Sequence, residues 1–413
     1  MTPQPRSVVI IGAGHGGAGL AAQLRQSGFA GSVTMIGSEP HLPYHRPPLS
    51  KKFDGAGVEQ LLRPAEFYAD MAIDLRTGVS ATAIDRERTT VHLDDGNEIG
   101  YDILVLATGS TPRSLPGSTV DNDSVLTLRT LDDARRLGAS LSHGNNLAIV
   151  GGGYVGMEVA AVARSRGVGV TVIEREDRIL ARVASAELSA LLTDYHRARG
   201  TEVLSRRSVV GVRTAGTIVT GIRLTDGSVI DCGTVLVGIG AVPDQSLAVD
   251  AGLVCDDGVI TDGDGRTSDP SIFAIGDVAR RPLDGHDELR RLESIPAATE
   301  QAARAAAVIL GLEPHQHEVP WFWSDQFDLK LKIAGLSTPE ARVITRRVPG
   351  KDAVSFFHLA PDDSVVAVET ISAPADFMAG KKLINRRTPV NPTALADPAV
   401  PLKTIVAESG VPA

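Results

Sequence analysis

The chain has 413 residues, which is too long for one hydrophobic core and predicts two or three domains. Hydrophobic residues make up 43% and charged residues 22%, and no apolar run reaches the roughly 20 residues of a membrane-spanning helix. Because the net charge is −9 and the N-terminus lacks the pattern of a signal peptide, we expect a cytoplasmic protein that binds neither nucleic acid nor membranes.

The first part of the chain has the pattern of a β–α–β unit. The β-branched run at 7–12 is predicted as a buried parallel strand. Residues 18–27 are predicted as a helix that stops before Gly28, and residues 32–39 as a second strand. A further buried strand is predicted at 101–113, with a turn at residues 108–110.

The same order begins again farther along the chain. Strands are predicted at 147–153 and 169–176, with a helix at 154–166 between them. A strand predicted at 233–244 takes the part that 101–113 has in the first unit. The pattern therefore indicates an internal duplication of architecture.

The last third of the chain has two different patterns. Within residues 271–279 a short strand is predicted that ends in Gly276-Asp277, and 295–310 are predicted as an alanine-rich helix. Residues 329–335 and 364–372 alternate with period two, as antiparallel strands do. We expect three domains, with these limits: 1–113 together with 243–318, then 114–242, then 319–413.

A glycine-rich turn follows the first strand of each duplicated unit. The glycines have the G-x-G-x-x-G spacing of a turn that holds a pyrophosphate at a helix N-terminus. They are Gly12, Gly14 and Gly17 in GAGHGG, and Gly151, Gly153 and Gly156 in GGGYVG. Two such turns predict an α/β fold with two Rossmann-like dinucleotide-binding domains in a glutathione reductase-like arrangement, followed by a C-terminal α/β domain.

An acidic residue follows each turn at the distance of a ribose-binding group. Glu39, preceded by Ser38, ends the second strand of the first unit, and Glu174 has the equivalent place in the second. A carboxylate at Glu174 accepts hydrogen bonds from ribose hydroxyls and repels a 2′-phosphate. We therefore expect NADH rather than NADPH at the second turn, although Arg175 and Arg178 lie nearby.

Three further features point to FAD at the first turn. Asp277, in AIGDVA, can offer its carboxylate to ribityl hydroxyls and its N–H group to phosphate. In HLPYHRPPLSKK, Arg46 can reach the pyrophosphate or adenosine side, and Lys51 the flavin ring. Glu158, on the helix after the second turn, is the predicted ion-pair partner of Lys51.

Several segments together carry a resemblance to a known family. They are GAGHGG, PHLPYHRPPLSK, LATGSTPR, LRTLDDA, GGGYVGMEVA, AIGDVA, RLESIPAATEQA and PWFWSDQ. In this combination the chain resembles the putidaredoxin reductase-like family, whose members are NADH-dependent ferredoxin reductases serving haem monooxygenases and aromatic-ring dioxygenases. The match covers nearly the whole chain in order, and PPLSK and PWFWSD are more specific than the glycine turns.

The resemblance implies an FAD domain, an inserted NAD domain and a C-terminal domain. Implied FAD contacts are Arg46, Lys51, Val79, Arg129, Asp277 and Ile295, to which we add Ala107, Thr108 and Gly109, where the strand at 101–113 turns. Implied NAD contacts are Val155, Glu158, Glu174, Arg182 and Gly240. Similar proteins usually have an acid in place of Ser38, so the FAD ribose is expected on Ser38, on Glu39 or on neither.

The two tryptophans, Trp321 and Trp323, follow Pro320 directly. In a family of this kind Trp323 covers the exposed edge of the flavin, where electrons leave, so we add it to the catalytic candidates with Lys51 and Glu158. No metal site is expected. The expected partner is a small iron–sulfur ferredoxin, of the two-iron, two-sulfur type, that feeds an oxygenase. Basic residues that could meet it are Lys330, Lys332, Lys381, Lys382, Arg386 and Arg387.

Other functions of a fold with two dinucleotide-binding domains require different residues or electron acceptors. A disulfide reductase needs a cysteine pair against the flavin, and the only cysteines are Cys232 and Cys255, which we expect to be inert. A rubredoxin reductase or an NADH oxidase differs only in its electron acceptor. A flavin- and NAD-binding regulatory protein switched by reduction is an alternative from another class. A monomer or a weak dimer is expected.

Overall fold

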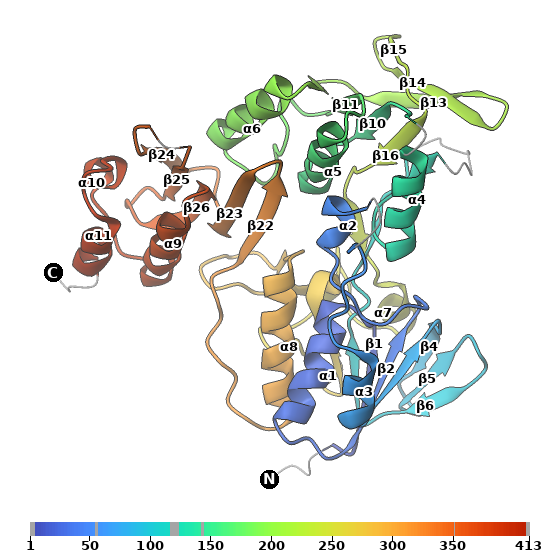
Figure 1. Ribbon diagram of the computed structural model, residues 1–413. Coiled ribbons are helices and arrows are strands. Elements are labelled where there is room, and N and C mark those ends of the chain that lie inside the picture. Colours follow the sequence, from blue (N-terminus) through green and yellow to red (C-terminus); the bar gives the residue numbers. More distant parts are fainter. Residues whose placement is uncertain (1–4, 54–56, 116–123, 142–143, 351, 410–413) are drawn as a thin grey trace. The chain divides into compact units, whose positions relative to one another are not determined.

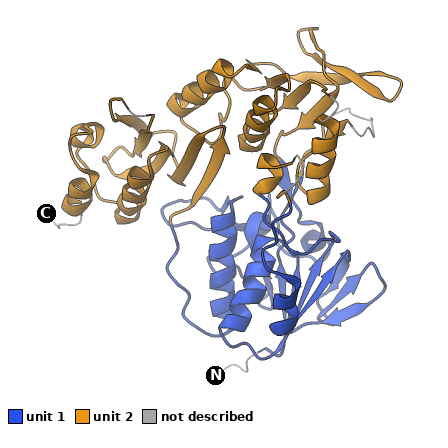
Figure 2. Ribbon diagram, in the orientation of Figure 1, with its two compact units in different colours: residues 1–46, 59–111, 241–318 blue, residues 47–58, 112–240, 319–413 orange. Residues whose placement is uncertain are grey.

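The structure is a computed structural model that describes residues 5–53, 57–115, 124–141, 144–350 and 352–409. The chain forms two compact units, which Figure 2 colours separately. Unit 1 consists of residues 1–46, 59–111 and 241–318. Unit 2 consists of residues 47–58, 112–240 and 319–413.

Unit 1 is built around a five-stranded parallel sheet in the order β19–β7–β1–β2–β3 (Figure 1). These strands are β1 (Ser7–Ile11), β2 (Ser32–Gly37), β3 (Ile73–Thr77), β7 (Ile103–Leu106) and β19 (Ile272–Ala274). Alternate side chains of β1 enter two cores, because successive residues of a strand face opposite ways. Val8 and Ile10 pack in one core, and Val9 and Ile11 in the other.

Helices α1 (His15–Gln26) and α8 (Ile295–Ile309) cover the face of the sheet to which Val8 and Ile10 point. The other face packs against Val91 and Leu93 of an antiparallel sheet, β4–β5–β6. The remaining elements of unit 1 are α3 (Ala65–Asp70), β4 (Ala81–Asp85), β5 (Thr90–Leu93), β6 (Glu98–Gly100), α7 (Ser246–Asp250), β18 (Val259–Ile260), β20 (Ala279–Arg281) and β21 (Arg290–Arg291).

Unit 2 contains a second five-stranded parallel sheet, in the order β12–β11–β10–β16–β9. Its strands are β9 (Val125–Leu126), β10 (Leu147–Val150), β11 (Val170–Ile173), β12 (Thr201–Leu204) and β16 (Thr234–Val237). The helices around it are α2 (Pro48–Lys51), α4 (Leu131–Leu141), α5 (Tyr154–Ser165) and α6 (Ala186–Ala198). An antiparallel sheet extends from it, formed by β13 (Val209–Ala215), β14 (Ile218–Leu224) and β15 (Val229–Ile230).

The two parallel sheets repeat one arrangement, which confirms the predicted duplication. Strands β7–β1–β2–β3 in unit 1 and β16–β10–β11–β12 in unit 2 follow the same order, and a glycine turn leads out of β1 and of β10. Each turn opens a helix, α1 or α5. The fold is of the α/β class, as predicted.

The C-terminal part of unit 2 is a five-stranded antiparallel sheet in the order β22–β23–β26–β25–β24. Its strands are β22 (Trp321–Gln326), β23 (Leu329–Gly335), β24 (Arg342–Arg347), β25 (Val354–Leu359) and β26 (Val365–Ile371), followed by helices α9 (Pro374–Arg386), α10 (Pro392–Ala396) and α11 (Leu402–Glu408). The two strands predicted here, β23 and β26, pair antiparallel.

The predicted strands at 101–113 and 233–244 each contain a turn at a glycine. In the first, the turn predicted at 108–110 is confirmed: β7 ends at Leu106, Gly109 has φ +79°, and β8 (Ser110–Pro112) follows. The strand at 233–244 is broken in the same way by Gly240, with φ +103°, before β17 (Ala241–Pro243). A positive φ cannot continue a strand, so the apolar run is longer than the element.

The first helix begins at His15 rather than at residue 18, because its opening turn consists of the glycines themselves. The strand predicted to end in Gly276 and Asp277 ends slightly earlier: β19 stops at Ala274, and Gly276–Val278 form a 3₁₀ turn. Among the described helices, none combines the length and apolar composition that crossing a lipid bilayer requires.

Candidate dinucleotide and redox sites

The first glycine turn can be occupied only by glycines at two of its three positions. Gly12 has φ +112°, and a Cβ there would overlap the carbonyl oxygen of Ala107 on the neighbouring strand. A Cβ on Gly17 would overlap the carbonyl oxygen of Gly12. At Gly14, by contrast, a Cβ would meet nothing within 4 Å, and no side chain caps the helix that begins there. The turn thus leaves backbone donors at a helix N-terminus, which fits a pyrophosphate.

The second turn repeats this geometry residue for residue. Gly151 has φ +107° and lies against the carbonyl oxygen of Gly238, and a Cβ on Gly156 would lie 2.5 Å from the carbonyl oxygen of Gly151. Gly153 has open space around it and begins α5 without a side-chain cap. Neither α1 nor α5 has an acidic residue in its own first turn that would repel a phosphate at the helix N-terminus.

The acid after the first turn already has two protein partners. Tyr44 donates its hydroxyl to Oε2 of Glu39 at 2.5 Å, and Nη2 of Arg46 pairs with Oε1 at 3.0 Å. The guanidinium of Arg46 also lies over the Tyr44 ring, 5.5 Å from its centroid. Glu39 therefore orients Arg46, while Ser38 is exposed at the end of β2. Which of Ser38 and Glu39 holds a ribose stays a prediction.

The acid after the second turn is tied to the turn itself. Oε2 of Glu174 accepts the N–H of Gly152 at 2.7 Å, and Oε1 accepts the N–H of Glu176 at 2.8 Å. Each carboxylate oxygen retains capacity for another donor, such as a ribose hydroxyl. The half-buried carboxylate is thus fixed in direction before any nucleotide binds.

The other predicted NAD residues lie around the same turn of unit 2. Val155, in the first turn of α5, is 45% exposed, so its side chain is available to a ligand. The exposed Arg182 reaches Gly240, since its Nη2 lies 3.6 Å from where a Cβ of Gly240 would stand. The predicted residues of the second site are therefore brought together.

Asp277 is held at the tip of the 3₁₀ turn in unit 1. Ser110 donates its hydroxyl to Oδ2 of Asp277 at 3.1 Å, and the N–H of Gly276 donates to Oε1 of Gln301 at 2.9 Å. Thr108 donates its hydroxyl to the carbonyl of Asp244 at 2.6 Å, which fixes the break after β7. Val79 packs against the core beneath the sheet, and Ile295 is the first residue of α8.

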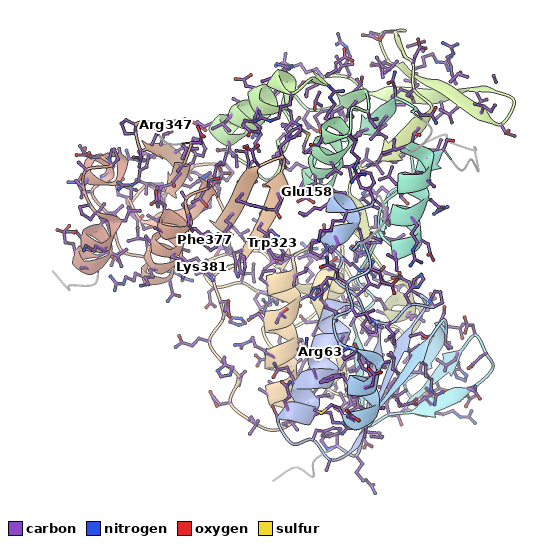
Figure 3. All side chains as sticks on the ribbon, in the orientation of Figure 1. Arg63, Glu158, Trp323, Arg347, Phe377 and Lys381 are labelled. Atoms are coloured by element: carbon purple, nitrogen blue, oxygen red, sulfur yellow. The ribbon has the colours of Figure 1, made fainter. Side chains whose placement is uncertain are left out.

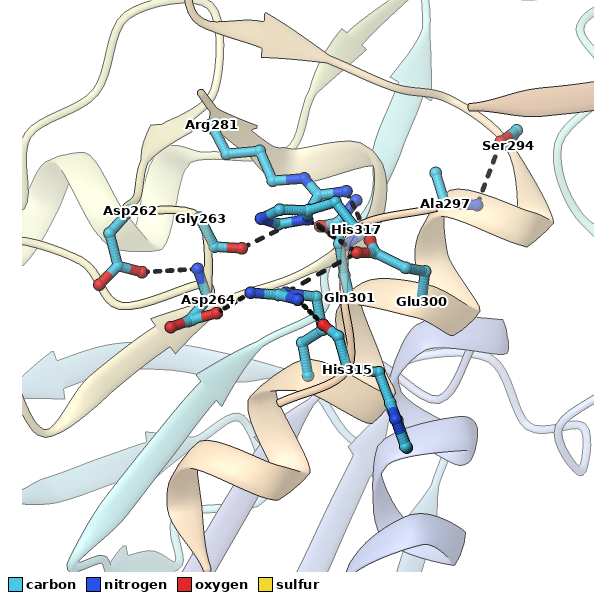
Figure 4. Close-up of polar contacts among 12 residues, drawn as sticks. Asp262, Gly263, Asp264, Arg281, Ser294, Ala297, Glu300, Gln301, His315 and His317 are labelled. Atoms are coloured by element: carbon cyan, nitrogen blue, oxygen red, sulfur yellow. Dashed lines mark hydrogen bonds and ion pairs between the residues drawn. The ribbon is translucent and has the colours of Figure 1, made fainter. Parts of the chain in front are cut away.

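A buried ionic cluster holds α8 in position (Figure 4). Glu300 pairs with Arg281 at 2.5 Å and lies 3.0 Å from Nδ1 of His317, and Arg304 pairs with Asp264. Such a cluster fixes geometry more than it adds stability, because burying charges is costly. It anchors the helix whose Gln301 supports Gly276, so it belongs to the scaffold of the Asp277 turn.

The predicted ion pair between Lys51 and Glu158 is present in unit 2. Nζ of Lys51 lies 2.7 Å from Oε2 of Glu158, and the carboxylate is only 5% exposed. Ser50 donates to the same oxygen at 2.5 Å, and Ser324 donates to Oε1 at 2.7 Å. A nearly buried carboxylate is tolerated because each oxygen has its own donor.

Trp323 lies on β22 and is half-buried (Figure 3). Its ring centroid is 5.8 Å from that of Trp321, which in turn contacts Phe377 at 5.7 Å. Nζ of Lys381 lies over the Trp321 ring, 5.4 Å from the centroid. Trp321 is thereby integrated into the C-terminal sheet and α9, as a structural aromatic.

Arg129 and the basic residues of the C-terminal part have local contacts. The backbone N–H of Arg129 donates to Oδ2 of Asp133 at the start of α4. Lys330 pairs with Asp325 at 3.0 Å, and Nη1 of Arg386 donates to Oγ of Ser409 at 3.2 Å. Lys330 thus has an acidic neighbour, so it adds less net positive charge to this group of basic residues than a lysine alone would.

The cysteines fit the expectation of inert thiols. Burial raises the pKa of the Cys232 thiol to about 11 and raises that of Cys255 above its ordinary value. Both are free, so they do not form the dithiol pair of a disulfide reductase.

Sequence reasoning missed the serines that hold the predicted acids. Ser110 donates to Asp277, and Ser50 and Ser324 donate to Glu158. Ser50 and Ser324 lie within PPLSK and PWFWSDQ, and period two on the second segment could have placed Ser324 opposite the tryptophans. Serine is common in such segments, so only the contact reveals its part.

The fold and the two turns define an oxidoreductase that holds two dinucleotides. A family model for pyridine nucleotide-disulphide oxidoreductases matches residues 6–302, and one for the reductase C-terminal domain matches residues 321–406. A probable ferredoxin reductase, CtmF of Castellaniella defragrans, is 44% identical over 95% of this chain and 97% of its own. Putidaredoxin reductase CamA of Pseudomonas putida is 40% identical over 97% of each chain.

A solved structure of a protein of the same kind has the same fold as this chain. In the covalent putidaredoxin reductase–putidaredoxin complex, one chain superimposes with a TM-score of 0.95 at 38% identity, covering 98% of this chain and 99% of that one. The chain belongs to the pyridine nucleotide-disulphide oxidoreductase family and, within it, to the ferredoxin reductases similar to putidaredoxin reductase. Its two dinucleotides are FAD and NAD(H).

Proposed function

We propose that this protein is an NADH-dependent ferredoxin reductase that transfers electrons from NADH through FAD to a two-iron, two-sulfur ferredoxin, which then supplies an oxygenase. The observation that carries the proposal is the repetition of one glycine turn suited to an anion, at Gly12–Gly17 and at Gly151–Gly156, in a chain that matches ferredoxin reductases over 95% or more of its length. Two dinucleotides held by one chain suit electron transfer between them.

FAD, when bound, accepts electrons from NADH as a hydride and releases them one at a time, which an iron–sulfur acceptor requires. The chain's own residues bind and orient the two dinucleotides. We assign FAD to the domain formed by 1–113 and 243–318. The residues that we assign to FAD contacts, from this domain and from the other two, are Gly12, Gly14, Gly17, Ser38 or Glu39, Arg46, Lys51, Val79, Ala107, Thr108, Gly109, Arg129, Asp277, Ile295 and Trp323.

We assign NADH to the domain formed by residues 114–242. Its contacts are Gly151, Gly153, Val155, Gly156, Glu158, Glu174, Arg182 and Gly240. The fixed carboxylate of Glu174 accepts hydrogen bonds from the ribose hydroxyls and repels a 2′-phosphate. Both effects favour NADH over NADPH. Lys51 and Glu158 fix the charge pattern of the redox site, because each holds the other in place at 2.7 Å.

The C-terminal domain, 319–413, contributes Trp323 and the electron exit. Relatives include the ferredoxin–NAD(+) reductase components of a p-cumate 2,3-dioxygenase system and of an anthranilate 1,2-dioxygenase system. These names support an oxygenase at the end of the chain of transfer. A cytoplasmic location and a monomeric or weakly dimeric state stay predictions.

The proposal is tested by comparing the rates at which the protein reduces different electron acceptors. The FAD-loaded protein is mixed with NADH and ferricyanide, and then with cytochrome c in the presence or absence of a two-iron, two-sulfur ferredoxin. We expect direct reduction of ferricyanide, and reduction of cytochrome c only with the ferredoxin. Equally fast cytochrome c reduction without it would refute the proposal, and a rubredoxin that outperforms every ferredoxin would assign the acceptor differently.

A further inference from the structure

Strand β22 presents different residues on its two faces. Successive side chains of a strand alternate, so Phe322, Ser324 and Gln326 share one face, opposite Trp321 and Trp323. The face with Ser324 lies against the helices that follow the second glycine turn. The ring of Phe322 meets Tyr154 of α5, with centroids 4.6 Å apart, and Ser324 and Gln326 are fully buried.

A line of hydrogen bonds runs through this face and ends on Glu158. Nε2 of His196, on α6, lies 3.0 Å from Oε1 of Gln326. Nε2 of Gln326 donates to Oγ of Ser324 at 3.2 Å, and Ser324 donates to Oε1 of Glu158 at 2.7 Å. The line therefore joins α6, β22 and α5 inside unit 2.

The direction of each bond is fixed by the chemistry of its groups. The amide nitrogen of Gln326 can only donate, so Ser324 accepts from it and uses its own proton for the Glu158 carboxylate. Oε1 of Gln326 then accepts from the N–H of His196. Burial lowers the pKa of His196 to about 4, so the ring is neutral and carries one N–H, which the line requires on Nε2.

Glu158 stands between this line and Lys51. Its Oε1 is held by Ser324, whereas its Oε2 accepts Ser50 and pairs with Lys51. A carboxylate held at one oxygen cannot rotate freely at the other. The direction of the Lys51 ammonium thus depends on a hydroxyl carried by β22.

We propose that Ser324 and Gln326 are positioning residues for hydride transfer, acting through Glu158 on Lys51. This inference rests on the proposed function, since it assumes that NADH reduces FAD in this protein. Trp323 lies on the opposite face of β22. Its part in electron transfer to ferredoxin is therefore separate from the part of Ser324 in hydride transfer. One strand then serves both half-reactions, with one face for each.

The test compares Ser324→Ala with a matched control, Ser355→Ala. Ser355 is also fully buried in the C-terminal sheet and donates to a carboxylate, Oδ2 of Asp376 at 2.8 Å, but it has no part in the line. The readouts are the anaerobic single-turnover rate of FAD reduction by NADH and the midpoint potential of the bound flavin. We expect Ser324→Ala to slow reduction about tenfold and to shift the potential, while Ser355→Ala changes neither.

A double-mutant cycle asks whether Ser324 acts through Glu158. Glu158→Gln is expected to slow reduction by itself, and adding Ser324→Ala is expected to slow it no further. Effects that multiply would overturn the proposal, because they would show that Ser324 acts independently. Gln326→Leu, one bond farther away, is expected to change the rate in the same direction by a smaller factor.

The outcomes separate this inference from the proposed function. A wild-type protein that is not reduced by NADH would end the proposed function and this inference with it. A wild-type protein that is reduced, with Ser324→Ala within about twofold of it, would overturn only the positioning role. If Ser324→Ala fails to retain FAD, Gln326→Leu decides, and an unchanged rate and potential in that variant refute the proposal.

Discussion

Replacing Glu174 with alanine removes the carboxylate that the structure fixes beside the second glycine turn. In the wild-type protein its two oxygens accept the N–H groups of Gly152 and Glu176, at 2.7 and 2.8 Å. The remaining lone pairs are those that we assign to the ribose hydroxyls of NADH. The substitution therefore removes ligand contacts and also frees the backbone of the turn.

The magnitude follows from the hydrogen bonds that are lost. A hydrogen bond to a charged acceptor contributes about 1.5–3 kcal/mol, and about 1.4 kcal/mol corresponds to a tenfold change in affinity. Loss of one ribose bond thus raises the KM for NADH about 10- to 100-fold, and freeing the turn raises it further. NADPH loses less, since the charge that repelled its 2′-phosphate is gone, so the preference for NADH falls.

The assay is ferricyanide reduction over a range of NADH and NADPH concentrations, with flavin content measured from visible absorbance. Glu202→Ala is the matched control, because Glu202 is an exposed acid of the same sheet that accepts only from Thr171 among the described contacts. Flavin content is expected to stay at the wild-type level in both variants. NADH kinetics in Glu174→Ala that equal those of Glu202→Ala would remove Glu174 from the nucleotide site.

Three further predictions follow from single contacts. Trp323→Ala is expected to leave FAD reduction by NADH intact while slowing transfer to ferredoxin, and equal loss of both rates in rapid-mixing experiments would point to a damaged flavin site instead. Gly17→Ala forces a Cβ onto the carbonyl of Gly12 and is expected to lower the free energy of unfolding by about 3 kcal/mol or more. Gly19→Ala on the same helix meets nothing closer than 3.6 Å and is expected to raise it by about 0.5–1 kcal/mol. Equal stabilities of the two variants in urea unfolding would contradict this reasoning. Burial lowers the pKa of His196 from 6.5 to about 4, so unfolding takes up a proton between these values, and stability falls by about 3 kcal/mol as pH drops from 6.5 to 4; His196→Gln is expected to flatten that slope, and an unchanged slope would count against it.

Local sequence patterns predicted the elements and the site residues that they contain. The spacing of glycines located both turns, since only glycine tolerates a positive φ beside a neighbouring strand, as at Gly12 and Gly151. The ion pair of Lys51 and Glu158 was also predicted and is confirmed. The turn after Leu106 was predicted and is confirmed, whereas the extent of the strand after Val237 was overestimated, because hydrophobicity continues where the backbone turns at Gly240.

What the sequence by itself determined is the class of chemistry: two pyrophosphate turns, their acids and the two tryptophans after Pro320. Only the tertiary structure decided which polar side chains support that chemistry. Ser50, Ser324 and His196 are far apart in the chain, yet they end on, or lead to, one buried carboxylate at Glu158. A buried carboxylate must receive hydrogen bonds from the donors that tertiary packing places beside it. No local sequence pattern specifies which donors these are.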